Sequence, residues 1–166
     1  SQRVVERNAG TIAAVIVEPL CQGSAGMRMY SAGYLGKLAR CCAENDVLLI
    51  VDEVAMGFGR TGKRFAFNHA GIDPDMVTLG KALTAGYMPL SACIVKDEIY
   101  ATFSDAPEDH TFYHGNTYAG HPIGCAAALA ALDIYEAEDT VARAAEMAAK
   151  MQQWMQPLAG LDGVKE

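Results

Sequence analysis

The feature that most constrains the fold of this chain is a continuous apolar run, Val-Leu-Leu-Ile-Val, at residues 47–51. Its length and its lack of polar residues predict a buried strand. Residues 11–18 form another run that ends before Pro19. They predict a second strand, which is expected to be buried on both faces, as in parallel sheets covered by helices. Residues 76–79 and 90–95 predict two further strands.

Helical patterns lie between and after these strands. Ser31 is a suitable N-cap for a first helix, because Leu35 and Leu38 then fall at helical spacing. Residues 119–136 and 140–156 predict two more helices. The order strand, helix, three strands and then helices predicts an α/β layer fold, with a mostly parallel sheet flanked by helices.

The last predicted helix carries a stripe of large apolar side chains. Its members are Met147, Met151, Trp154 and Met155. Such a stripe usually packs into a core, so we expect it to be buried rather than to bind a cofactor.

Composition excludes several classes of partner. The 166 residues carry a net charge of −7, which argues against nucleic acid or an anionic membrane surface as a partner. The Ala-rich stretch at residues 122–132 is well short of the roughly 18 residues of a membrane span. Five cysteines without a C-x-x-C pair predict reduced thiols in a cytoplasmic protein.

Charged side chains stand at the ends of three predicted strands: Glu18, Asp52 and Lys81. Ligands of α/β sheets bind beyond the carboxyl ends of the strands, so this coincidence is the main indication of a functional site. A lysine at the mouth of an apolar sheet is partly desolvated, which favours the neutral amine that forms a Schiff base. The alternative is a surface lysine that caps a loop.

Asp52 follows directly on the apolar run and needs hydrogen bonds or a cationic partner there. A protonated pyridine nitrogen would be such a partner, and pyridoxal phosphate needs one to act as an electron sink. The alternatives are an aspartate that caps a helix or pairs with Arg60.

Two other motifs were weighed against this site. Residues 57–62 match G-x-G-x-x-G, but the pattern does not lie at a strand-to-helix turn, so a nicotinamide dinucleotide site is not favoured. His110 and His114 are four residues apart, yet no carboxylate or cysteine completes a metal site. Residues 114–117 predict a loop whose N–H groups and hydroxyl suit a phosphate, or a simple turn bent at Asn116.

Taken together, these segments resemble the class III aminotransferases, pyridoxal phosphate enzymes of fold type I. Residues 51–62 (VDEVAMGFGRTG) are similar to the signature loop of that family, and residues 74–83 (PDMVTLGKAL) to its lysine segment. Residues 17–23 and 114–120 also have counterparts. The resemblance runs from about residue 13 to residue 136.

The resemblance implies roles around a bound pyridoxal 5'-phosphate. Lys81 would form the Schiff base with the cofactor and then shuttle a proton. Asp52 would bind the pyridinium nitrogen, and Val54 would pack on the face of the ring.

Other implied roles reach beyond one subunit. Thr117, with Asn116 beside it, would contact the cofactor phosphate of a neighbouring subunit, so the resemblance implies a homodimer with shared active sites. Glu18 would face a substrate-gating arginine late in the full-length sequence.

The branch of the family stays open between two alternatives. Residues 22–27 and 87–92 are most similar to the biotin-pathway branch, which takes its amino group from S-adenosylmethionine and passes it to a keto acid. Residues 120–122 are more similar to the branch that transfers amine from an ω-amino acid to pyruvate. Ala55 stands where ornithine-type members carry glutamine, which disfavours that branch.

Members of the family are much longer than this chain. The resemblance therefore implies that residues 1–136 are a segment of the large, cofactor-binding domain, and that residues 137–166 form a helix leading toward a C-terminal small domain. An alternative of another class is an inactive large-domain fragment or an interaction module.

Overall fold

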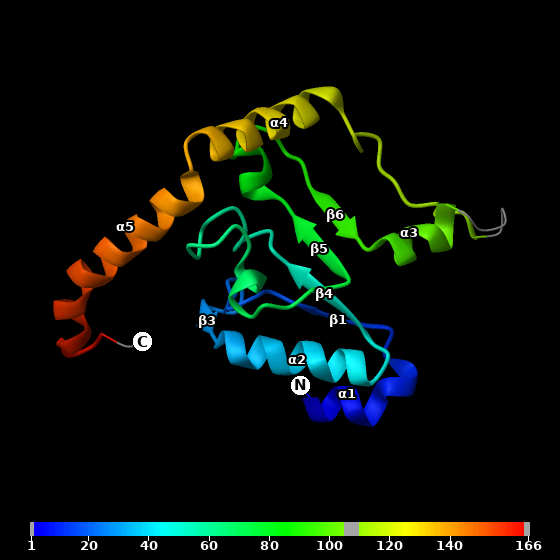
Figure 1. The fold of residues 1–166 in the computed structure, drawn as a ribbon, viewed down its shortest axis with the longest axis horizontal. Coiled ribbons are helices and arrows are strands. Elements are labelled where there is room, and N and C mark those ends of the chain that lie inside the picture. Colours follow the sequence, from blue (N-terminus) through cyan, green and yellow to red (C-terminus); the bar gives the residue numbers. More distant parts are fainter. Residues whose placement is uncertain (1, 105–109, 165–166) are drawn as a thin grey trace.

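The centre of the molecule is a four-stranded sheet (Figure 1). The computed structural model describes residues 2–104 and 110–164. The strands, in the order β1-β4-β5-β6, are β1 (Ala14–Val17), β4 (Leu48–Asp52), β5 (Met76–Leu79) and β6 (Ala92–Val95). Strands β1, β4 and β5 are parallel, and β6 is antiparallel to β5. The predicted α/β fold with a mostly parallel sheet is confirmed.

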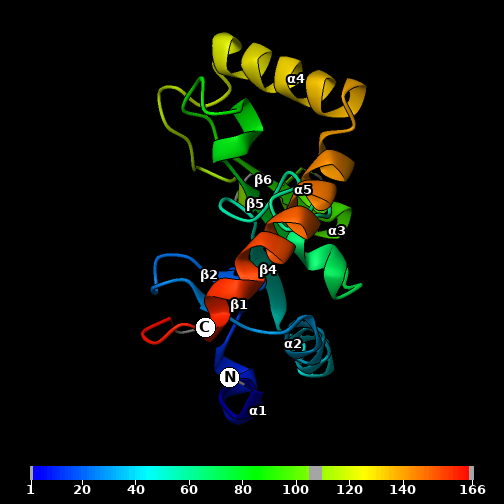
Figure 2. The ribbon, with the colours of Figure 1, turned by 90° about the vertical axis from the view of Figure 1, so that its left-hand side faces the viewer.

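Helix α2 (Ala32–Glu44) covers one face of the sheet. It begins as predicted, because the Ser31 hydroxyl accepts a hydrogen bond of 3.2 Å from the N–H of Tyr34. Helix α1 (Gln2–Asn8) lies beside α2 on the same side (Figures 1 and 2). The core between these helices and the sheet consists of Val5, Leu38, Cys41, Cys42, Val47, Leu49 and Val51.

Strand β1 is not buried on both faces, so that prediction is wrong. Val15 and Val17 pack toward the α2 core, and Ile16 therefore points to the opposite face, since side chains alternate along a strand. There Ile16 is 62% exposed.

Helix α4 (Pro122–Ala137) lies at the end of the sheet opposite to α1 and α2 (Figure 2). It packs against η3 (Lys81–Thr84), a 3₁₀ turn that follows β5. Leu79, Leu83 and Ala128 form the core of this contact. The lysine segment thereby packs against a helix far along the sequence through Leu83, while Lys81 itself is exposed rather than desolvated as expected.

Helix α5 (Thr140–Met155) runs out from the sheet and continues into η5 (Gln156–Gly160) (Figure 1). The prediction that its Met-Trp stripe is buried is wrong: the four side chains are 47–66% exposed, and α5 contains no buried residue. Its first turns pass close to two glycines: a Cβ atom added at Gly59 would lie 3.5 Å from Val141, and one at Gly62 would lie 3.5 Å from Ala145.

Several short elements were not predicted from the sequence. They are α1, η1 (Ala9–Thr11), the hairpin of β2 (Cys21–Gln22) and β3 (Arg28–Met29), η2 (Ala66–His69), η3, α3 (Asp97–Ser104) and η5. In the described part of the chain, no helix is both long and apolar enough to cross a membrane.

Candidate active site

Lys81 begins the turn η3, directly after the carboxyl end of β5 and Gly80. Its backbone has a φ of 43°, in the left-handed region that residues other than glycine rarely occupy. Ala85, which ends the same turn, has a φ of 50°. Such conformations persist only where the surrounding structure holds them, and they are enriched at functional sites.

Two cavities meet at Lys81. One, of about 290 Å³, is lined by Glu18, Gly23, Ser24, Asp52, Val54, Ala55 and Lys81. The other, of about 520 Å³, is lined by Val54, Gly80, Lys81, Pro89, Leu90, Ser91, Asn116, Tyr118, Ala119 and Gly120. Lys81 and Val54 belong to both linings, and five of the six candidate residues from the sequence line one or both of these neighbouring cavities.

Asp52 is the last residue of β4 and is partly buried. Its Oδ1 atom accepts a hydrogen bond of 3.0 Å from the N–H of Val54, which fixes the carboxylate against the following turn. No ion pair of the described chain joins Asp52 to Arg60, so that alternative reading is wrong. The carboxylate lines the same cavity as Lys81.

Glu53, the next residue, is fully buried. Its Oε1 atom accepts a hydrogen bond of 2.8 Å from the N–H of Phe67, and its carbonyl accepts one of 2.9 Å from the N–H of Gly57. Burial raises the pKa of the Glu53 carboxyl, and the charge of Asp52 raises it further. Hydrogen bonds from the backbone N–H groups of Phe67 and Ala66 lower the pKa but do not cancel the rise. Sequence reasoning did not assign this residue a function, although a second carboxylate after a buried strand was a signal.

Glu18 lies just beyond β1 and reaches the cavity from the other side of Asp52 along the sheet. Its Oε2 atom accepts a hydrogen bond of 3.0 Å from the N–H of Gly23, and the hydroxyl of Tyr30 donates to its backbone carbonyl. Burial raises the pKa of Tyr30 to about 12, so its hydroxyl remains a donor at neutral pH.

The loop before α4 brings Asn116 to the second cavity. The Asn116 side chain accepts a hydrogen bond of 3.1 Å from the N–H of Tyr118, and its carbonyl accepts one of 3.0 Å from Ala119, so the predicted turn is present. Thr117 is exposed and is not among the residues that line either cavity. Within residues 2–104 and 110–164, His110 and His114 belong to no group able to hold a metal ion.

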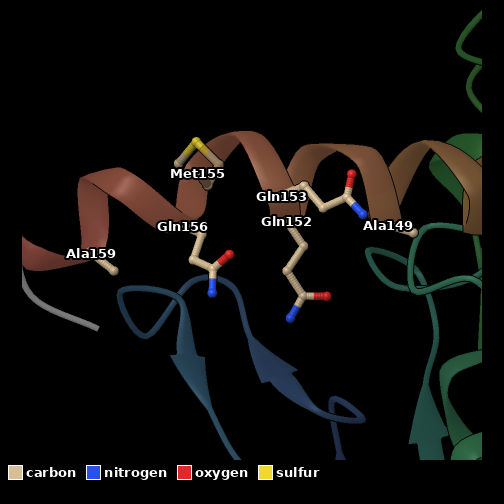
Figure 3. Close-up of a pocket in the computed structure, with 6 residues that line it drawn as sticks. All are labelled: Ala149, Gln152, Gln153, Met155, Gln156 and Ala159. Carbon is tan, nitrogen blue, oxygen red and sulfur yellow. The ribbon is translucent and has the colours of Figure 1, made fainter.

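A different cavity, of about 560 Å³, lies along α5 and η5 (Figure 3). It is lined by Ala149, Gln152, Gln153, Met155, Gln156 and Ala159. It contains no charged side chain and none of the strand-end residues, so it is not the site of the chemistry.

Comparison with known proteins gives one consistent family. The profile of the family "Aminotransferase class-III" matches residues 1–166. The adenosylmethionine-8-amino-7-oxononanoate aminotransferase of Geobacter sulfurreducens is 41% identical over 98% of this chain and 36% of its own length. The beta-alanine–pyruvate aminotransferase of Pseudomonas aeruginosa is 42% identical over 95% of this chain and 36% of its own length.

Comparison with solved structures indicates the same family. The crystal structure of adenosylmethionine-8-amino-7-oxononanoate aminotransferase from Methanocaldococcus jannaschii superposes with a TM-score of 0.93 at 40% identity, over 99% of this chain and 39% of that one. An amine transaminase from an uncultivated Pseudomonas species, in a form described as PLP-bound, superposes with a TM-score of 0.87 at 42% identity, over 95% of this chain and 36% of that one. The chain spans about a third of the length of the curated relatives that it matches.

Proposed function

Since this chain belongs to the class III aminotransferases, we propose that it carries the cofactor-binding centre of a pyridoxal phosphate-dependent aminotransferase. One observation carries the proposal: Lys81, Asp52 and Val54 line a single cavity at the carboxyl ends of the neighbouring parallel strands β4 and β5. An interaction module would not require an amine, a carboxylate and an aliphatic wall to face one space.

The residues present suit this cofactor. Lys81 offers the amine that holds its aldehyde carbon, Asp52 the carboxylate that faces its ring nitrogen, and Val54 the apolar surface for its ring. When bound, pyridoxal phosphate supplies an electron sink for charge at the substrate carbon. The Val54 N–H orients the Asp52 carboxylate, and the Lys81 amine would accept and return the proton of the substrate carbon.

Reduction and peptide mapping test this assignment. The full-length protein is incubated with pyridoxal phosphate and reduced with borohydride, and the labelled peptide is identified by mass spectrometry. We expect the pyridoxyl group on Lys81. Labelling at Lys63 or Lys96 instead would overturn the assignment.

We propose S-adenosylmethionine as amino donor and a long-chain keto acid as acceptor. The 41% identical relative named for adenosylmethionine and 8-amino-7-oxononanoate supports this choice. Ala55 also leaves an apolar space beside Asp52 in the cavity. Two unlike substrates would use the site in turn.

A second candidate is transfer of amine from a β- or ω-amino acid to pyruvate. The observation that favours it is the 42% identical beta-alanine–pyruvate aminotransferase. Half-reactions separate the two candidates, because the donor alone changes the absorption spectrum of the cofactor. S-adenosylmethionine is expected to cause this change, and β-alanine is not. A response to β-alanine only would establish the second candidate.

We also propose a cytoplasmic homodimer with shared sites. Thr117 and Asn116 would contact the cofactor phosphate of the neighbouring subunit, with residues 1–136 in the large domain and 137–166 leading to a small domain. Exposed aromatic side chains beside Thr117, Tyr113 at 90% and Tyr118 at 77%, support a contact surface there. Glu18 would face a gating arginine outside this chain. A dimeric structure with Thr117 remote from every cofactor phosphate would contradict the shared site.

A further inference from the structure

The turn that carries Lys81 is held in an unfavourable backbone conformation. Lys81 and Ala85, at its two ends, both have positive φ values. Inside the turn, the N–H of Leu83 donates to Gly80 at 2.9 Å and that of Gly86 to Lys81 at 3.3 Å. A turn of this size does not hold two left-handed residues by itself, so groups outside it have to stabilise it.

One such group comes from α4, far along the sequence. The hydroxyl of Tyr135 donates a hydrogen bond of 2.7 Å to the carbonyl of Ala82, inside the turn. The same carbonyl accepts the N–H of Ala85 at 3.0 Å. Tyr135 therefore bonds to the carbonyl that also closes the left-handed end of the turn.

Tyr135 also contacts the segment that follows Asp52. Its ring lies 5.9 Å from the ring of Phe58, centroid to centroid. Phe58 itself packs against the buried cluster of Leu79 and Leu83. One side chain thus touches both segments that lead away from the cavity, the one after β4 and the one after β5.

We propose that Tyr135 is a positioning residue, whose hydroxyl holds the turn η3 and thereby sets where the Lys81 amine stands relative to Asp52. This inference rests on the proposed function of Lys81. Tyr135 lines neither cavity of Lys81, and its hydroxyl reaches the lysine turn through the Ala82 carbonyl.

The first test measures the turn without the cofactor. Hydrogen exchange of the cofactor-free, full-length protein is followed by mass spectrometry in wild type, Tyr135→Phe and the matched control Tyr100→Phe, an exposed tyrosine of α3. Loss of one net hydrogen bond predicts about two- to tenfold faster exchange of the Ala85 and Gly86 amides in Tyr135→Phe only. Equal exchange in all three proteins would overturn the proposal.

The second test separates positioning from mere support. The pH midpoint of the absorption change of the bound cofactor is expected to move in Tyr135→Phe and to stay in Tyr100→Phe. The other titratable side chains lining the two cavities, Glu18, Asp52 and Tyr118, are unaltered in both variants. If exchange is faster but the pH midpoint is unchanged, Tyr135 only supports the structure and the proposal is overturned. The same conclusion follows if Tyr135→Phe does not fold.

The two proposals fail in different ways. Borohydride labelling of a lysine other than Lys81 would end the proposed function, whereas the exchange of the Ala85 and Gly86 amides would still show whether Tyr135 holds the turn. Labelling at Lys81 with no effect of Tyr135→Phe would end this inference alone.

Discussion

Asp52 keeps its orientation through a backbone donor rather than through a cation. The hydrogen bond from the N–H of Val54 engages one carboxylate oxygen, Oδ1. An amide side chain can accept the same hydrogen bond with its oxygen. The charge of Asp52 and its geometry can therefore be separated by experiment.

We predict that Asp52→Asn in the full-length protein folds normally and loses most of its transaminase activity. The asparagine keeps the Val54 contact but has no charge to stabilise a protonated ring nitrogen. We expect turnover to fall about a hundredfold or more. Each tenfold loss corresponds to an increase of about 1.4 kcal/mol in the activation barrier. Single-turnover rates and thermal unfolding measure the two effects. Turnover equal to that of wild type would contradict the proposed role.

Gly57 is constrained by the buried carboxylate residue beside it. A Cβ atom at this position would lie 2.9 Å from the carbonyl oxygen of Glu53, and that oxygen is fixed by the N–H of Gly57 itself. We predict that Gly57→Ala destabilises the protein by about 1–3 kcal/mol, as overpacking does. Urea unfolding tests this, with Gly10→Ala as control, where a Cβ meets nothing within 4 Å. Equal midpoints for the two variants would contradict the prediction.

At the scale of elements, Asp75 joins three strands at the end of the sheet away from the cavities. Its carboxylate accepts the N–H of Leu49 at 2.8 Å and pairs with the Lys96 ammonium at 3.0 Å. Its own N–H donates to the Leu49 carbonyl at 3.0 Å. These contacts fix the register of β4 against β5, and that register sets Asp52 beside Thr78.

Burial alone would raise the pKa of Asp75, but the N–H of Leu49 and the Lys96 ammonium outweigh it and hold the pKa below its usual value. A lowered folded pKa means stability that is present above the unfolded pKa and lost as the pH falls through the folded one. We predict that Asp75→Asn costs about 1–2 kcal/mol at neutral pH. The difference in the free energy of unfolding between wild type and Asp75→Asn should disappear in acid.

Urea unfolding at several pH values measures this gap. Asp73→Asn is the control, because Asp73 pairs with the same Lys96 but its side chain is 90% exposed. An exposed pair contributes little, so Asp73→Asn should change stability by less than about 1 kcal/mol. A gap for Asp75→Asn that persists in acid would show that the carboxylate charge is not its cause.

The elements that could be predicted from the sequence are those with a local signal. Residues 76–79 match β5 residue for residue, and Ser31 caps α2 as expected. The two-residue strands of the β2–β3 hairpin are too short to show a period. The hydrogen bond from Tyr135 to Ala82 joins residues 53 positions apart, and no local sequence pattern predicts it.

At the scale of the whole molecule, the fold class followed from the order of the elements, and the grouping of Glu18, Asp52 and Lys81 from strand ends meeting at one edge of the sheet. The place of Val54 was expected only from the resemblance to the family. The prediction that the apolar stripe on α5 is buried was wrong, because burial of a helix face depends on the rest of the molecule. Helical periodicity tells which side chains share a face, but it does not tell whether another part of the molecule covers that face.

The exposed stripe gives a prediction for the 166-residue chain by itself. Trp154 is its single tryptophan and is 66% exposed. Its fluorescence should therefore resemble that of a solvated indole and be quenched readily by acrylamide. A blue-shifted emission that resists quenching would contradict the placement of α5.

Val54 lines both cavities, and this restricts which substitutions the site can accept. A substitution at Val54 changes both spaces at once, whereas Ala55 borders only the smaller of them and Leu90 only the larger. New substrates are therefore expected to be accommodated at Ala55 or Leu90, while Val54 tolerates little variation. If the proposed function is correct, directed evolution of the full-length protein should start from those two positions.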